Sequence, residues 1–349
     1  MTNKKAKSLL YIFTVSQSHP GLKIKFQGQK NAFESLTTYT KTLAISILAT
    51  DSPVKKAQKT VQFELLCTFY ILFSRLTTIY IRYNPKTPLL LLAACLMSKL
   101  KTVWIEHNIN YDTELNLLNR KWEWRLHRYS LWLFRHTWAH HIGVTPEITQ
   151  VLQKSGIPFT ATIQNGYTKP PTTTPPDIAI ISQVKKFIQP NHRIAIMVTN
   201  GYRWHGVEEI LELITPHPIQ LIIVGPYPNL IPTTKILPLG PVQPDTLLHI
   251  YPLCDFGIGT FRLDMLGLTQ ASPLKTREYL GNGLPILVNY HDSAEDIPEL
   301  APYVFNHATT PNALLNITHT HFDHPTIEAI AGTHLNWASQ LKPILESHV

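Results

Sequence analysis

The chain is poor in cysteine and in charge. Only 3 of its 349 residues are cysteines, and Cys67, Cys95 and Cys254 each lie within an apolar run. That scatter excludes a disulfide-stapled scaffold and offers no C-x-x-C zinc spacing, so we expect three buried thiols in a reducing compartment. Charged residues make up 15% of the chain and hydrophobic ones 44%, a balance that excludes an intrinsically disordered protein.

Long hydrophobic runs are also missing. The longest, Pro88 to Met97, falls well short of the roughly 20 residues that a bilayer-spanning helix needs. The basic segment 1–7 precedes a short apolar run that turns polar at Gln17 and lacks a small-residue cleavage site. This pattern predicts a first strand and not a signal peptide, so we expect a cytoplasmic protein.

Motifs for metals, nucleoside triphosphates and redox cofactors are absent too. The sequence contains no Walker P-loop, no G-x-G-x-x-G and no H-E-x-x-H, and no Asp-x-Asp motif precedes a candidate nucleotide site. The segment from His319 to His324 offers at most an adventitious metal contact. We therefore expect no metal and no resident cofactor, and we regard dinucleotide redox chemistry as disfavoured.

What the chain does have is an excess of basic residues. It carries 31 Lys and Arg against 23 Asp and Glu, a formal net charge of +8. A surface of this sign favours anionic partners such as sugar nucleotides, phospholipid headgroups or nucleic acid, and charge alone does not choose among them. The length of 349 residues suffices for two domains with separate cores.

Apolar runs of strand length alternate with amphipathic stretches, which predicts parallel sheets covered by helices on both faces. The strands expected in the first half are Leu9–Val15, Thr42–Leu48, Thr77–Arg82, Thr102–Glu106, His140–Val144 and Thr160–Ile163. Those expected in the second half are Arg193–Val198, Ile219–Val224, Lys235–Leu239, Phe256–Gly259 and Pro285–Tyr290, with helices at 207–213, 244–253 and from Ser272. The fold class expected is α/β, with two doubly wound Rossmann-like domains facing across a cleft.

A proline-rich segment marks the expected domain boundary. Residues 169–176 contain too many prolines for a helix or a strand and predict a semi-rigid linker. The expected domains are therefore residues 1–168 and 177–324. A C-terminal helix in 325–349 would pack back on the first domain.

The segment from Gln270 to Ile286 has the features of a cradle for a nucleotide diphosphate. Ser272 is a good helix N-cap and Pro273 fits the first helical position, so free backbone N–H groups would attract an anion. Lys275 adds a positive charge beside them. Glu278 follows nearly two turns into the helix, about 9 Å along its axis, which is roughly the distance from a phosphate to a ribose.

Several short segments occur in an order that resembles one family. They are 21–23 (Gly-Leu-Lys), 106–108 (Glu-His-Asn), 163–167 (Ile-Gln-Asn-Gly-Tyr), 204–207 (Trp-His-Gly-Val), 222–225 (Ile-Ile-Val-Gly) and 272–285. Together they resemble the GT-B glycosyltransferases, specifically the large retaining family 4 that includes sucrose synthases and bacterial mannosyl- and glucosyltransferases. The resemblance spans most of the chain, although each segment alone is a weak signal.

The resemblance implies roles for residues of the second half. Glu278 matches the second glutamate of the paired-glutamate motif of the family and would bind the ribose hydroxyls, with Ser272 at the same helix start. Arg203 and Lys275 would neutralise the diphosphate. The loop at Gly225 would surround the base and sugar of the donor.

Two positions depart from the pattern of the family. Gln270 stands where the first glutamate is expected, and an amide binds a sugar hydroxyl but does not stabilise positive charge as a carboxylate does. His205 stands where a lysine usually precedes Gly-Val, so it would help only when protonated or as a neutral donor.

Residues of the first half receive roles from the same resemblance. His107 looks like the histidine of the family that faces the donor sugar. Gly21 would sit in a loop that lets the acceptor approach, and Glu106 would lie on the acceptor side. Each of these positions also has a plain structural explanation: a solvated helix position for Glu278, a core histidine for His107, and solvated loops for Arg203 and His205.

The segment 119–138 predicts a helix with a basic edge. The basic residues Lys121, Arg125, Arg128 and Arg135 fall within roughly a quarter of the helix circumference. Beside them lies an apolar stripe of Leu117, Trp124, Leu131, Phe134 and Trp138. A basic edge beside tryptophans suits an anionic membrane surface, while a core-packing helix with a solvated edge explains the pattern equally.

The function predicted from the sequence is a retaining, metal-independent glycosyltransferase. It would move a hexose from a UDP- or GDP-sugar to a glycan or lipid-linked acceptor in bacterial surface polysaccharide assembly. His107 and Gln270 would orient the sugar, and no nucleic acid partner is expected. The alternatives are a sugar-nucleotide-binding scaffold that has lost turnover, a basic membrane or nucleic-acid adaptor, and an epimerase acting on a UDP-sugar.

Overall fold

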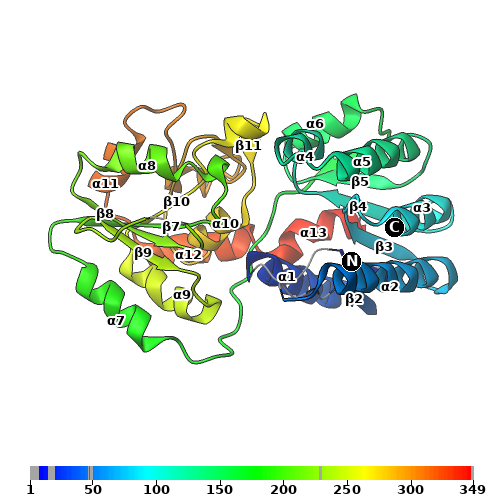
Figure 1. Cartoon of the computed structure of the whole chain (residues 1–349), viewed down its shortest axis with the longest axis horizontal. Coiled ribbons are helices and arrows are strands. Elements are labelled where there is room, and N and C mark those ends of the chain that lie inside the picture. The colour runs from blue at the N-terminus through cyan, green and yellow to red at the C-terminus, as the bar shows by residue number, and fades with distance from the viewer. Residues whose placement is uncertain (1–7, 15–19, 46, 48–49, 228–229, 347–349) are drawn as a thin grey trace, which may run out of the picture. The chain divides into compact units, whose positions relative to one another are not determined.

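The computed structural model describes residues 8–14, 20–45, 47, 50–227 and 230–346. The basic segment 1–7 and the predicted strand ends at Val15 and Leu48 lie outside the described residues. The chain divides into two compact units, one made of residues 1–164 and 337–349 and the other of residues 165–336 (Figure 1). We call these unit 1 and unit 2.

Unit 1 is built on a parallel sheet of six strands in the order β2-β1-β3-β4-β5-β6. Its strands are β1 Leu9–Phe13, β2 Thr40–Ala44, β3 Thr78–Arg82, β4 Thr102–His107, β5 His140–Gly143 and β6 Thr160–Thr162. Its helices are α1 Pro20–Leu36, α2 Pro53–Phe73, α3 Pro88–Met97, α4 Tyr111–Leu117, α5 Lys121–Phe134, α6 Pro146–Lys154 and α13 Trp337–Glu346. All six predicted strands are therefore confirmed to within a few residues at their ends.

The two faces of this sheet bury different side chains. Leu10 and Ile12 of β1 belong to an aliphatic core beneath α2, α3 and α5. Tyr11 of β1 faces the other way, where it contacts Phe33 of α1 at 4.9 Å between ring centroids. Alternate residues thus face opposite helix layers, as expected for a parallel sheet covered on both sides.

The last helix, α13, completes unit 1 by packing against α1. Trp337 is only 2% exposed and fills the space beside Gly28, where a Cβ atom would lie 2.3 Å from the tryptophan ring. The Lys25 ammonium lies 5.3 Å from the centroid of the same ring. The predicted C-terminal helix is in fact two helices, because the chain turns at 335–336 between α12 His324–His334 of unit 2 and α13 of unit 1.

Unit 2 contains a second parallel sheet of six strands, in the order β14-β12-β10-β7-β8-β9. Its strands are β7 Arg193–Val198, β8 Ile219–Val224, β9 Ile236–Gly240, β10 Phe256–Ile258, β12 Ile286–Val288 and β14 Val304–Asn306, with β11 Gln270–Ala271 and β13 His291–Asp292 as a separate pair. The α-helices are α7 Ile178–Phe187, α8 Val207–Ile214, α9 Pro244–Ile250, α10 Leu274–Leu280, α11 Ala313–His319 and α12, and the 3-10 turns are η1 Arg203–His205, η2 Tyr251–Leu253, η3 Leu263–Leu266 and η4 Ala301–Tyr303. The predicted α/β fold class is confirmed.

The proline-rich segment belongs to unit 2. The backbone N–H groups of Thr173 and Thr174 donate to the Asp245 carboxylate, each at 3.1 Å, and Tyr167 N donates to Leu335 O at 2.7 Å. These bonds tie residues 169–176 to α9 and fasten the preceding residues beside the end of α12. The division between the units accordingly falls at 164/165, a few residues before the predicted boundary at 168.

Candidate functional site

Helix α10 carries two buried ionisable groups that form no ion pair with any residue in the described part of the chain. The Lys275 ammonium nitrogen is buried and has no hydrogen-bond partner among the described residues. Burial lowers the pKa of Lys275 from 10.5 to about 7. A buried cation without a counter-charge is unfavourable, so this position is suited to receive an anion.

Glu278 lies one turn further along α10 and is 9% exposed. Burial raises the pKa of its carboxyl group from 4.5 to about 7, and the nearby Tyr251 hydroxyl offsets part of this effect. The backbone around it is held in place, because Asn282 Nδ2 donates both to Glu278 O at 2.7 Å and to the Tyr167 hydroxyl at 3.0 Å. The carboxylate itself forms no ion pair with any residue in the described part of the chain, which leaves it available to accept from a ligand hydroxyl.

The start of α10 differs from the prediction. The helix begins at Leu274, and Pro273 is the capping residue, without a side-chain cap. Ser272 is not the N-cap, because its hydroxyl accepts from Asn165 N at 2.9 Å and from the guanidinium of Arg277 at 3.3 Å. Ser272 therefore fastens α10 to the first residue of unit 2 and does not face the helix start.

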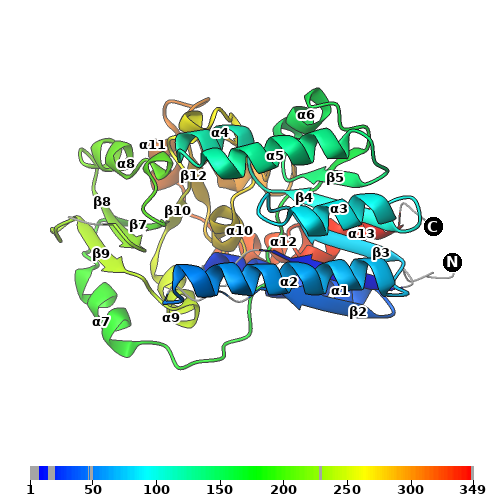
Figure 2. The same cartoon turned by 45° about the vertical axis from the view of Figure 1, so that its right-hand side comes forward.

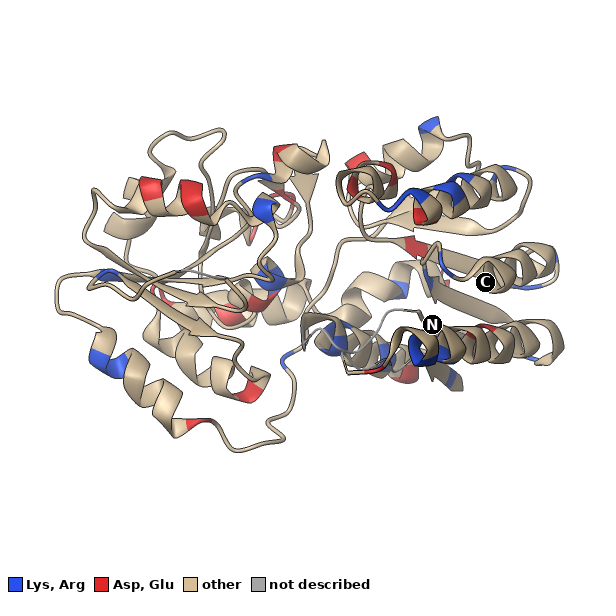
Figure 3. Ribbon diagram, in the orientation of Figure 1, with Lys and Arg blue, Asp and Glu red and all other residues tan. Residues whose placement is uncertain are grey.

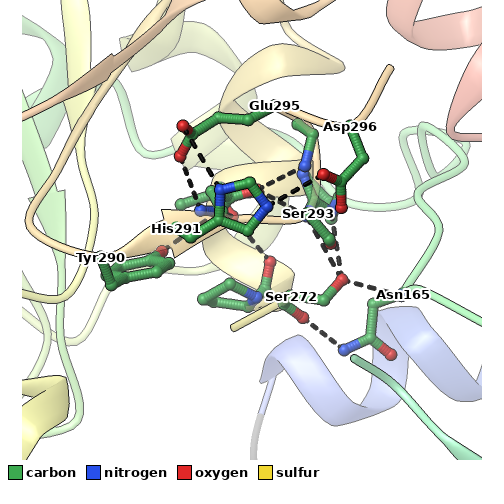
Figure 4. Close-up of polar contacts among 12 residues, drawn as sticks. Asn165, Ser272, Tyr290, His291, Ser293, Glu295 and Asp296 are labelled. Carbon is green, nitrogen blue, oxygen red and sulfur yellow. Dashed lines mark hydrogen bonds and ion pairs between the residues drawn. The ribbon is translucent and has the colours of Figure 1, made fainter. Parts of the chain in front are cut away.

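A buried ion pair holds α10 in place through Arg277, one of the residues of this helix. Arg277 Nη2 and Asp292 Oδ1 lie 2.6 Å apart, and both side chains are fully buried. Asp292 also accepts from Thr276 Oγ1 at 2.9 Å and from the Tyr290 hydroxyl at 3.1 Å. Figure 4 shows Asn165 and Tyr290 at opposite edges of this network, with Ser272 and Ser293 between them. The network fixes the helix from which Lys275 and Glu278 project.

Predicted donor residues from two loops lie at the carboxyl edge of the unit 2 sheet. Gly225 follows β8 with φ of 113°, and a Cβ atom there would come within 1.8 Å of Thr199 O. Thr199, just after β7, also binds His205 Nδ1 through its hydroxyl at 2.9 Å. Only glycine fits this close backbone approach, so Gly225 sets the path of the loop.

His205 is a neutral histidine in this arrangement. Burial, followed by the positive charge of Lys275, lowers its pKa from 6.5 to about 2. The charge of Lys275 acts on His205, so the η1 turn and α10 lie near one another. A role of His205 as a neutral donor stays a prediction. Arg203, in the same 3-10 turn, is exposed.

Gln270 lies apart from α10 in the short β11 strand. It pairs in parallel with His291 of β13, and its side chain is half-buried.

A cavity of about 410 Å³ in unit 2 is lined by Arg193, His217 and Ile219, at the opposite, amino-terminal ends of β7 and β8. That cavity therefore lies away from Lys275 and Glu278.

In unit 1, Glu106 near the end of β4 is 2% exposed and ion-paired. Lys25 of α1 donates to Glu106, and Gln29 Nε2 donates to its other oxygen at 3.2 Å. Burial alone would raise the pKa of Glu106, but the charges of Lys25 and Arg82 and these hydrogen bonds outweigh burial and lower it. Glu106 is thus a carboxylate held in its ionised form.

His107 lies among aromatic rings, 1% exposed. Its Nε2 is 3.0 Å from His141 Nδ1, and its ring stacks on Tyr83 at 4.5 Å between centroids. Burial and the neighbouring histidines lower its pKa well below 6.5. The assignment of His107 to the donor sugar therefore rests on the resemblance alone.

Gly21 lies in the first turn of α1 and not in a loop before it. No atom lies within 4 Å of the position that a Cβ would occupy there, so the backbone shows no need for glycine.

In the part of the chain that the structure describes, no cluster of three or more His, Cys, Asp or Glu side chains is arranged to hold a metal ion.

Three important residues were missed by the sequence reasoning. Lys25 lies outside every motif that the sequence offers. Arg277 and Asp292 pair across 15 positions, and no short motif marks them. Arg277 directly precedes Glu278, but the residue type alone does not distinguish a buried arginine from a solvated one.

Comparison with solved structures identifies the architecture. A sucrose-phosphate synthase from Thermosynechococcus elongatus has 12% identity and a TM-score of 0.62, covering 97% of this chain and 96% of that chain. The lipopolysaccharide outer core galactosyltransferase WaaB has 9% identity and a TM-score of 0.60, covering 98% and 100%. Anabaena HepE, solved with UDP-glucose, has 13% identity and a TM-score of 0.57, covering 97% and 98%.

A UDP-GlcNAc 2-epimerase from Neisseria meningitidis, bound to UDP-GlcNAc, is similar at 15% identity with a TM-score of 0.52, covering 97% and 99%. No protein-family model and no curated protein sequence matches the chain. At these identities the likeness shows the fold alone. It is the two-domain GT-B fold, as the resemblance in the sequence predicted.

Proposed function

We propose that the chain is a family 4 glycosyltransferase that transfers a hexose from a UDP- or GDP-sugar with retention at the anomeric carbon. The observation that carries this proposal is the pair of buried groups on α10 that form no ion pair, the Lys275 ammonium and the Glu278 carboxyl group. An ammonium without a counter-ion suits a diphosphate, and a carboxylate three residues later suits the ribose hydroxyls. The similarity to structures solved with UDP-glucose and UDP-GlcNAc supports the same nucleotide class.

The chemistry follows from where charge develops. As the bond from the sugar to the diphosphate breaks, negative charge accumulates on the leaving phosphate oxygens. Lys275 would stabilise that charge from a position that water does not screen, and Arg203 would add a second cation from the surface. His205 would donate as a neutral group. In our proposal, these cations and hydrogen-bond donors stabilise the leaving diphosphate without a metal ion.

The remaining predicted residues orient the ligands. Glu278 would fix the ribose and so place the anomeric carbon, a positioning effect that contributes to rate by holding reactants in a productive geometry. Gln270 and His107 would contact the sugar, and the loop at Gly225 would border the base. We propose a glycan or lipid-linked acceptor in bacterial surface polysaccharide assembly, in line with the fold shared with the lipopolysaccharide enzyme WaaB.

A surface of unit 1 supports a peripheral membrane location at the inner face of the cytoplasmic membrane. Helices α2, α3 and α5 cover one face of the sheet (Figure 2), and their outer sides carry most of the exposed large hydrophobic residues. These are Val54, Val61, Leu65, Leu66, Phe69, Leu72 and Phe73 on α2, Leu89 and Leu96 on α3, Leu100 after it, Trp122, Tyr129 and Trp132 on α5, and Trp138 beyond it. We call this surface the apolar face of unit 1.

The charges around the apolar face are mostly basic. Lys121, Arg125 and Arg128 of α5 are exposed, and Figure 3 shows Lys and Arg along that helix. The acid of α2, Glu64, is buried and caps α3 by accepting from Leu89 N at 2.6 Å. The apolar stripe predicted for α5 is only partly exposed. Leu131 and Phe134 are buried in the core of unit 1, and Trp124 is half-buried beneath Arg128.

A basic rim around exposed aromatic and aliphatic side chains suits anionic lipid. In the part of the chain that the structure describes, no helix is at once long enough and apolar enough to cross a bilayer. Our proposal is therefore adsorption of the apolar face onto the membrane surface.

The test of the proposed function is a ligand titration followed by thermal stability. Wild-type protein, Glu278→Ala and the control Glu212→Ala, an exposed position on α8, are titrated with UDP, GDP and their hexose conjugates. A nucleotide at about 100 times its dissociation constant adds about 2.7 kcal/mol of stability. We expect one nucleotide to stabilise wild type and Glu212→Ala but not Glu278→Ala. No shift with any nucleotide contradicts the transferase and favours the adaptor.

Product analysis separates the remaining alternatives. Incubation of the bound sugar nucleotide with candidate acceptors should yield a glycoside whose anomeric configuration, read by NMR, matches that of the donor. Conversion to a second sugar nucleotide without an acceptor identifies an epimerase, a class that shares the fold. Binding without any turnover identifies the scaffold.

A further inference from the structure

Unit 1 has its own buried charges at the carboxyl edge of its sheet. Arg82 is the last residue of β3 and lies opposite Glu106 of β4 in the register of the two strands. Lys25 reaches the same place from α1 and donates to both Glu106 and Asn108. Two cations therefore meet one carboxylate in this cluster, and that carboxylate is already used by Lys25 and Gln29.

The cluster has hydrogen-bond donors left over. Arg82 is 8% exposed, and its Nε and Nη1 atoms are buried without a hydrogen-bond partner among the described residues. Asn108 Nδ2 is buried and unpartnered in the same way, because the side-chain oxygen of Asn108 is the atom that accepts from Lys25. The guanidinium carbon lies 5.0 Å from the centroid of the Phe13 ring, a contact that does not satisfy an N–H group in the plane of the guanidinium.

A guanidinium buried without an acceptor is a strongly unfavourable arrangement for the empty protein. A water molecule would satisfy an N–H group but would not balance the charge. An oxyanion does both, because the fork of a guanidinium matches two oxygens of a phosphate or a carboxylate. The unpaired donors of Arg82 and Asn108 thus call for a ligand group that is rich in acceptors and negatively charged.

We propose that Arg82 and Asn108 form a subsite for an oxyanion, a phosphate monoester or a carboxylate, carried by the sugar acceptor. This inference rests on the proposed function, in which Lys275 and Glu278 of unit 2 serve the donor and leave the buried cation of unit 1 for the second substrate. The acceptor is accordingly an acidic molecule, either a sugar phosphate or a uronic acid.

The experiment measures binding of glucose 6-phosphate, glucuronate and neutral glucose by calorimetry at constant ionic strength. The proteins are wild type, Arg82→Met, Arg82→Lys, Asn108→Asp and Lys275→Met, with the exposed Arg75→Met as the matched control. We expect at least one of the two anions to bind wild type, Arg75→Met and Lys275→Met alike, with glucose binding much more weakly. Arg82→Met and Asn108→Asp should weaken the affinity for the anion by about tenfold or more, and Arg82→Lys should retain part of the wild-type affinity. Phosphate preference over carboxylate, or the reverse, identifies which acidic acceptor is used.

A second measurement distinguishes ligand binding by Arg82 from a purely structural role of this residue. Without ligand, Arg82→Met should melt close to wild type, since relief of the unsatisfied guanidinium is offset by loss of its attraction to Glu106, and most of the side-chain volume is kept. UDP-glucose binding should be unchanged in Arg82→Met and weakened in Lys275→Met. If wild type binds UDP-glucose but neither anion, or if Arg82→Met binds both anions as wild type does, the subsite is overturned and the transferase proposal stands. If the anion binds at Arg82 but no nucleotide binds, the proposed donor site fails instead.

Discussion

Lys275 and Glu278 lie three residues apart on α10, and neither neutralises the other. No described residue forms an ion pair with either group, and burial brings both pKa values to about 7 from opposite directions. The consequence is an unusual charge state. Lys275 is mostly charged below about pH 7 and Glu278 mostly charged above it, so the state in which both groups are charged is most populated near neutrality.

Donor binding should therefore depend on pH in a bell-shaped manner. The affinity for UDP-glucose, whose diphosphate does not titrate in this range, should fall below pH 7 as Glu278 becomes protonated and above pH 7 as Lys275 loses its proton. Calorimetry from pH 5.5 to 9 measures this. Glu278→Gln should remove the acid limb of the profile and Lys275→Met the basic limb. A flat profile in wild type would show that neither group contacts the donor.

The stability of the ligand-free protein should reveal the burial of Lys275. Because folding lowers its pKa from 10.5 to about 7, this group opposes folding below pH 7, and the opposition fades as pH rises to 10.5. Lys275→Met should therefore be more stable than wild type at pH 7, by an amount on the order of 4–5 kcal/mol, and no more stable near pH 10.5. Chemical denaturation at the two pH values measures the difference. The exposed Lys186→Met on α7 should show no such pH-dependent gain.

Gly225 should tolerate no side chain. A Cβ atom there would overlap Thr199 O at 1.8 Å, and φ of 113° is unfavourable for other residues. Gly225→Ala should lower stability by about 2–4 kcal/mol and weaken nucleotide binding, because the loops after β7 and β8 must separate. Gly240→Ala is the control: φ is 67° but no atom lies within 4 Å, so only backbone strain of about 1 kcal/mol is expected. Equal losses in both variants would argue against the close contact.

Breaking the ion pair beneath α10 should destabilise unit 2. Both side chains of the Arg277–Asp292 pair are fully buried, so Asp292→Asn leaves an uncompensated guanidinium. The expected loss is about 3–5 kcal/mol by chemical denaturation. The exposed pair of Arg262 and Glu209 provides the comparison, and Glu209→Gln should cost less than about 1 kcal/mol. A small loss in Asp292→Asn would mean that water enters the network.

Membrane adsorption should depend on the apolar face of unit 1. Phe69→Glu with Phe73→Glu should reduce cosedimentation with phosphatidylglycerol vesicles, because both rings are more than half exposed on α2 and would insert into the interface. Ile178→Glu on α7 is equally exposed but lies in unit 2, and it should leave binding unchanged. Equal vesicle binding by wild type, the Phe69→Glu and Phe73→Glu double variant and Ile178→Glu would contradict membrane adsorption through this face.

The sequence was most informative where local physics decides the structure. Nearly continuous apolar runs predicted β7 Arg193–Val198 and β8 Ile219–Val224 to the residue, since strands buried on both faces are mostly apolar. The strand β14, Val304–Asn306, was missed because its residues are mostly only partly buried and form no apolar run. Existence and type of the longer elements could thus be read, and their ends less well.

The site was harder to predict because its polar groups are arranged by distant partners. Ser272 has the chemistry of an N-cap, but Asn165 and Arg277 take its hydroxyl, and no local rule reveals that competition. Leu131 and Phe134 fit a surface stripe by periodicity, yet they enter the core of unit 1. Helical periodicity shows which residues share a face and does not show which face is covered.

The return of the chain to unit 1 at Trp337 has a consequence for biosynthesis. Unit 2 is continuous in sequence, so a ribosome delivers all of it in one stretch, and it can begin to fold as soon as residue 336 has emerged. Unit 1 is synthesised first but must wait for its last helix, because the slot beside Gly28 and Lys25 stays open until Trp337 arrives. The first domain to be translated is therefore the last to be completed.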